Sequence, residues 1–149
     1  MPHFFHAARA AHEGLQSARG RRFLSLEDHQ FLNEVYTRLD HLKDMPVDPF
    51  RPLHGGRHDK NVINSRRGHL WLDFDNVCRG PLEWDLSCLP EAAGRYREVD
   101  AELMQELGKL RSWTTAVWCW IIYDQSEEKR EAAEYHLAKL KGHYSETAT

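Results

Sequence analysis

An amide and a carboxylate near the middle of the chain have the spacing of a small site for a hard metal ion. Asn61 begins the run Asn-Val-Ile-Asn (61–64), and Asp73 lies within His-Leu-Trp-Leu-Asp-Phe (69–74). Both runs alternate apolar with polar residues, and Ser-Arg-Arg-Gly (65–68) between them has turn chemistry, so the pattern predicts a β-hairpin. Asn61 and Asp73 would then lie at the open ends of two paired strands, where their oxygen atoms can share a Mg²⁺ ion.

Two histidines before the hairpin raise the alternative of zinc. His54 and His58 are four residues apart, a spacing that shares one face only on a helix. The segment His-Gly-Gly-Arg-His (54–58) is rich in glycine and predicts a loop instead. No third ligand follows at a metal-site spacing, and no Cys-x-x-Cys pair is present. Zinc is therefore the weaker alternative.

The region 54–86 resembles the catalytic core of the aminoglycoside phosphotransferase family, which is similar to the protein kinases. The loop of that family reads His-Gly-Asp-x-His-x-x-Asn, and a hairpin and an Asp-Phe-x metal motif follow it. Asp-Phe-Asp (73–75) matches the metal motif, and Gly-Pro-Leu-Glu-Trp-Asp-Leu (80–86) is similar to the family's Gly-x-Pro-x-x-Trp-Asp-Leu segment. Four residues match the loop itself: His54, Gly55, His58 and Asn61.

The resemblance implies a role for each of these residues. Asn61 and Asp73 would bind the Mg²⁺ ion that bridges the phosphates of ATP, while His54 and His58 would belong to the catalytic loop. Asp85 would accept hydrogen bonds from the backbone of that loop and so act structurally, as His54 would also do. The family transfers the γ-phosphoryl group of ATP to a hydroxyl of a small molecule, which here would be an alcohol or an aminoglycoside.

One position of the loop departs from the family. Gly56 occupies the place of the catalytic aspartate, and glycine cannot accept the proton of the substrate hydroxyl. Asp59, three positions further on, would aim elsewhere. The 149 residues also contain no phosphate-cradling sheet before the loop, so the N-terminal nucleotide-binding lobe is expected to be absent.

We therefore expect a chain that is inactive in phosphoryl transfer by itself. Three alternatives stay open. The chain can be a pseudo-enzyme that binds a ligand or a partner, it can be completed by a separate small lobe, or it can be a fragment of a longer protein.

Helices are predicted around the loop and the hairpin. Gly20 is expected to end the first of them, and Ser25 is suited to cap the second. Gly-Pro (80–81) starts a short helix that runs to about Leu89. The fold class is thus mainly α with one small β-hairpin, the C-terminal (large) lobe of the protein-kinase-like fold, and residues 1–149 form a single domain. Apolar residues recur at helical spacing in four segments: 4–18, 25–42, 100–121 and 126–141.

The composition favours a cytoplasmic protein. Of its residues, 41% are hydrophobic and 29% charged, and a net charge of −3 gives no footprint for nucleic acid. The cysteines (Cys78, Cys88 and Cys119) lack a disulfide pattern, so reduced thiols are expected. The most apolar stretch, 113–123, is too short to span a membrane, and no signal peptide is expected.

An exposed apolar surface is expected where the absent lobe would cover the hairpin. Such patches on soluble proteins usually mark contact surfaces. We therefore predict a homodimer or a partner that covers the cleft. The candidate residues are Val62, Leu70, Leu72 and Phe74.

Overall fold

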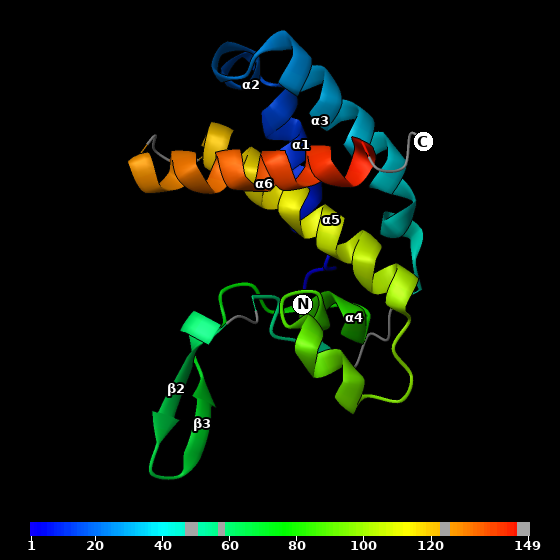
Figure 1. Cartoon of the computed structure of the whole chain (residues 1–149), viewed down its shortest axis with the longest axis vertical. Helices are drawn as coiled ribbons and strands as arrows, with labels where there is room; N and C mark the ends of the chain where they lie inside the picture. The colour runs from blue at the N-terminus through cyan, green and yellow to red at the C-terminus, as the bar shows by residue number, and fades with distance from the viewer. Residues whose placement is uncertain (47–50, 57–58, 123–125, 146–149) are drawn as a thin grey trace. The chain divides into compact units, whose positions relative to one another are not determined.

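The computed structural model describes residues 1–46, 51–56, 59–122 and 126–145. The chain divides into two compact units: unit 1 comprises Met1–Phe4 and Pro46–Gly108, and unit 2 comprises Phe5–Met45 and Lys109–Thr149. Helices dominate, which confirms the mainly-α class (Figure 1), and two short antiparallel strand pairs accompany them, of which Figure 1 labels β2 and β3. The sequence predicts only one of these pairs. The prediction that residues 1–149 form a single domain stays a prediction, since compact units are not necessarily separate domains.

Unit 2 is built from helices around a buried tryptophan. Trp113 is fully buried, and its indole N–H donates a hydrogen bond of 2.8 Å to the carbonyl oxygen of Leu32. The ring of His12 stacks on that of Tyr36 at 3.8 Å, and burial lowers the pKa of this histidine. The elements are α1 (His6–Gln16), α2 (Ala18–Phe23), α3 (Leu26–Leu39), η1 (Asp40–Asp44), the end of α5 (Ala101–Val117), the π-helical turn η4 (Trp118–Ile122) and α6 (Glu127–Ser145).

Serine caps determine where two of these helices begin. Ser25 caps α3 as predicted, because its hydroxyl accepts a hydrogen bond from the amide of Asp28 at 3.0 Å. Ser17 caps α2 in the same way, so the prediction that Gly20 ends the first helix is wrong. Gly20 lies inside α2, where an added Cβ would stand 2.3 Å from the carbonyl oxygen of Leu15. The glycine thus permits close packing of the two helices and is no C-terminal cap.

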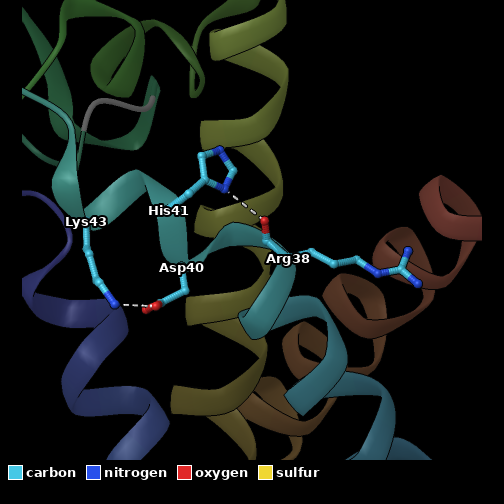
Figure 2. Close-up of polar contacts among 4 residues, drawn as sticks. All are labelled: Arg38, Asp40, His41 and Lys43. Carbon is cyan, nitrogen blue, oxygen red and sulfur yellow. Dashed lines mark hydrogen bonds and ion pairs between the residues drawn. The ribbon is translucent and has the colours of Figure 1, made fainter.

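The end of α3 continues into η1 through local polar contacts (Figure 2). The Nδ1–H group of His41 donates to the carbonyl oxygen of Arg38 at 2.9 Å, and Lys43 forms an ion pair with Asp40. The guanidinium of Arg38 points away from these three residues and lies over the ring of Tyr144, 5.1 Å from its centroid. These contacts belong to the framework of unit 2.

Unit 1 carries the strands. The predicted hairpin is present: Val62 pairs with Trp71, and Ser65 pairs with Gly68, whose φ of +108° suits the turn. The short predicted helix is also present but ends earlier than Leu89. The elements are β1 (Pro52–Leu53), η2 (Asp59–Asn61), β2 (Val62–Ser65), β3 (Gly68–Trp71), β4 (Cys78–Arg79), α4 (Leu82–Leu86), η3 (Pro90–Arg95) and the start of α5.

The first four residues belong to unit 1 and complete its small β1–β4 pair. The amide of Phe4 donates to the carbonyl oxygen of Arg79 at 2.9 Å, and the ring of Phe4 contacts that of Trp84. Gly80 is tightly enclosed, since an added Cβ would lie 2.9 Å from the Phe4 ring. Phe4 is therefore a core residue of this unit and no part of the first helix. Over the described ranges, every helix is too short or too polar to cross a bilayer.

Candidate functional site

A buried carboxylate holds the loop that precedes the hairpin. Asp85 lies on α4 and is only 3% exposed. Its Oδ2 atom accepts a hydrogen bond from the amide of His54 at 3.0 Å, and its Oδ1 atom accepts one from the amide of Gly55 at 2.9 Å. Hydrogen bonds to a charged acceptor are strong, and they offset the cost of burying the carboxylate. The resemblance implies contacts of this kind for Asp85.

The ring of His54 ties the loop to the end of the hairpin. Its Nε2 atom lies 2.9 Å from the carbonyl oxygen of Leu72, and its Nδ1 atom lies 3.3 Å from the amide nitrogen of Gly56. A carbonyl oxygen only accepts and an amide only donates, so the ring carries its proton on Nε2. Both nitrogen atoms are thus occupied, and His54 holds the loop against the end of the hairpin.

The two glycines of the loop differ in what they require. Gly55 has a φ of +78°, and an added Cβ would stand 1.9 Å from the backbone oxygen of Asn76. Only glycine fits there. An added Cβ at Gly56 would meet the Nδ2 atoms of Asn76 at 3.4 Å and of Asn61 at 3.8 Å, which are ordinary contacts. The contacts of a Cβ at position 56 therefore do not require a glycine there.

Asn61 is largely buried at the start of the hairpin. Its Nδ2 group donates to the carbonyl oxygen of Gly56 at 2.9 Å, and its own carbonyl accepts from the amide of Leu72 at 2.8 Å. The side chain therefore closes the loop onto the hairpin. Because the nitrogen is used in this way, the side-chain oxygen is the atom that Asn61 can offer to a cation.

Asp73 follows Leu72, whose amide donates to the carbonyl oxygen of Asn61. The two candidate ligands, Asn61 and Asp73, therefore occupy neighbouring positions at the base of the hairpin. Asp73 is exposed, and its φ of +59° is the one positive value for a non-glycine residue in the described parts of the chain. Such backbone conformations are uncommon and gather at functional sites. The strained backbone singles out Asp73 independently of the motif.

The described residues contain no group of three or more histidine, cysteine or acidic side chains that could hold a metal ion. A Mg²⁺ ion on Asn61 and Asp73 would thus draw its other ligands from water and phosphate, as Mg²⁺ commonly does. His58 lies outside the described residues, so its place in the loop stays a prediction.

Sequence reasoning missed two residues of this region. Asn76 packs against both glycines of the loop, and Glu83, which is 8% exposed, accepts a hydrogen bond of 3.1 Å from the amide of Asp100. The burial of Glu83 in the Gly-Pro-Leu-Glu segment assigns it to holding the start of α5.

Comparison with known proteins adds no relative: no protein-family model matches the chain, and neither does any curated protein or solved structure. The resemblance rests on the motifs between residues 54 and 86 alone.

Proposed function

We propose that this chain is the larger lobe of an aminoglycoside-phosphotransferase-like protein, of the kinase-like fold, which keeps the support of the catalytic loop but not its base. The observation that carries the proposal is the buried Asp85 carboxylate, which accepts hydrogen bonds from the amides of His54 and Gly55, 31 and 30 residues away in the sequence. An isolated buried carboxylate is costly, so its pairing with this loop indicates a built arrangement.

In this proposal Asn61 and Asp73 are the positions for Mg²⁺, and through it for the phosphates of ATP. Charge neutralisation by the metal is a main part of phosphoryl transfer. The step that fails is proton acceptance from the alcohol or aminoglycoside, because Gly56 has no side chain. A general base contributes about 10²–10⁴-fold in rate. The chain is then a binding protein with a phosphotransferase-like site.

The first test is phosphoryl transfer itself. Purified protein with Mg²⁺, radiolabelled ATP and an aminoglycoside such as kanamycin is expected to give no labelled acceptor above a reaction without protein. A Gly56→Asp variant is expected to fold, since a Cβ at position 56 meets only ordinary contacts, and to stay inactive, because the 149 residues hold no glycine-rich phosphate loop. Turnover by the wild-type protein that an Asp73→Asn substitution abolishes would contradict the proposal.

A second candidate function, association with a second copy of this chain, is favoured by the apolar face of the hairpin. Ile63 and Leu70 pair across the strands and lie on one face, which Leu72 extends. They are 45%, 48% and 42% exposed, and no residue of β2 or β3 is buried. Phe74 is exposed as predicted, whereas Val62 is half-buried. An isolated two-stranded hairpin is marginally stable, so a covering partner would stabilise it.

Association through this face is testable by light scattering. We expect the wild-type chain to self-associate as its concentration rises into the high micromolar range, because burial of apolar surface contributes roughly 25 cal/mol per Å². The double variant Leu70→Lys, Leu72→Lys is expected to remain monomeric. His69→Lys, on the opposite face of the same strand, is the matched control and should associate like the wild type. A wild-type monomer that binds no apolar dye would rule this candidate out.

A further inference from the structure

A cavity of about 640 Å³ opens beside His54 in unit 1. Pockets that hold small molecules are typically about 300–1,000 Å³ in volume, with mostly apolar walls and a few polar groups. The walls here come from several parts of unit 1: the segment before the loop, the end of the hairpin, α4, and the segment after η3. The lining residues include Arg51, His54, Trp71, Phe74, Leu82 and Tyr96.

Aromatic rings form much of the wall. The His54 ring contacts the rings of Trp71 and Phe74, with centroid distances of 5.4 Å and 4.8 Å. Both nitrogen atoms of His54 are already bonded within the protein, so it presents ring surface and no free polar atom. Phe74 and Tyr96 are 56% and 43% exposed although they line a hollow. A flat ring placed there would cover this surface in the tilted and offset contacts that aromatic rings favour.

A positively charged side chain, that of Arg51, lines this cavity. Arg51, Leu82 and Tyr96 also line a second, more polar cavity of about 270 Å³, so the two hollows adjoin. The Arg51 side chain is exposed, and within the described residues nothing engages its guanidinium group. Asp85 lines the first cavity and Glu83 the second, and both carboxylates accept backbone hydrogen bonds; Arg97 and Glu98 also line the second cavity. Arg51 is the one arginine or lysine among the described residues that line the first cavity, so it is the group suited to receive an anion there, in the two-point geometry that a carboxylate allows.

We propose that this cavity binds a planar aromatic carboxylate, with the ring against Trp71, Phe74 and Tyr96 and the carboxylate on Arg51. The site requires neither a metal ion nor phosphoryl transfer, so it stands independently of the phosphotransferase-like function. An aminoglycoside is a polycation without an aromatic ring, and it would match neither part of the cavity.

The experiment compares two probes of equal shape and opposite charge, 2-naphthoate and 2-naphthylmethylammonium. NMR titration, followed at the indole N–H of Trp71, is expected to show naphthoate binding at least about tenfold more tightly, because only the anion gains a charge-assisted bond. Arg51→Gln is expected to remove this preference. Arg66→Gln, which changes an exposed arginine at the hairpin turn, is the matched control and should preserve it.

A substitution in the aromatic wall distinguishes binding in this cavity from non-specific binding of the aromatic probes. Tyr96→Leu changes a residue that is 43% exposed, so it should fold, and it is expected to weaken both probes by about tenfold through the lost ring contacts. Equal affinity of the wild-type protein for the two probes would overturn the proposal. So would naphthoate binding that survives both Arg51→Gln and Tyr96→Leu.

Discussion

An Asp85→Asn variant is expected to lose about 2–4 kcal/mol of the free energy of unfolding, because hydrogen bonds to a buried charged group each contribute about 1.5–3 kcal/mol. The substitution keeps the size of the side chain but replaces one acceptor oxygen with an NH₂ group. One of the amides of His54 and Gly55 would then face a donor and remain unsatisfied in a buried place. The loop is expected to loosen first.

Denaturant unfolding monitored by circular dichroism measures this loss. Asp75→Asn is the matched control, since it removes the same charge from an exposed position in the same unit, and its effect should stay within about 0.5 kcal/mol. Equal stability of the two variants would mean that the Asp85 carboxylate does not hold the loop.

A Gly55→Ala variant is expected to be destabilised by about 2–5 kcal/mol, since the left-handed backbone costs about 1–2 kcal/mol and overpacking about 1–3 kcal/mol more. The overpacking arises because the new methyl group would stand 1.9 Å from the backbone oxygen of Asn76. Backbone cannot rotate away as a side chain can, so the loop and the segment after the hairpin would have to separate.

Gly56→Ala provides the matched control for this prediction, one residue along the same loop. Its backbone needs no glycine and its nearest new contact is 3.4 Å, so the variant should be neutral or more stable by about 0.4–1 kcal/mol. Thermal unfolding of both variants checks the contrast. A Gly56→Ala protein as unstable as Gly55→Ala would contradict the loop geometry described above.

Short sequence patterns are enough to predict the hairpin and the start of α3, because these features depend on neighbouring residues. The alternation in residues 62–65 and 68–71, with turn residues between them, is enough for the hairpin. Ser25 ahead of an apolar periodicity is enough for the start of α3. The contact of Asp85 with the loop is indicated only by the motif, because a contact between residues about thirty positions apart produces no periodic pattern in the sequence.

The remaining features depend on tertiary contacts. β1 and β4 are two residues long, too short for any alternation, and the N-terminal residues complete the pair, since Pro2 and Phe4 form backbone hydrogen bonds with Arg79 of β4. Gly20 was misassigned because a glycine that permits close packing looks in sequence like one that ends a helix. The aromatic cavity has no sequence signal, since its walls come from distant segments of unit 1.

The Asp85 carboxylate holds the loop that precedes the hairpin, and amide hydrogen exchange measured by NMR tests this arrangement most directly. The amides of His54 and Gly55 are expected to exchange far more slowly than that of Arg66 in the exposed hairpin turn, and to lose this protection in Asp85→Asn. Exchange of His54 and Gly55 in the wild-type protein as fast as that of Arg66 would contradict the account.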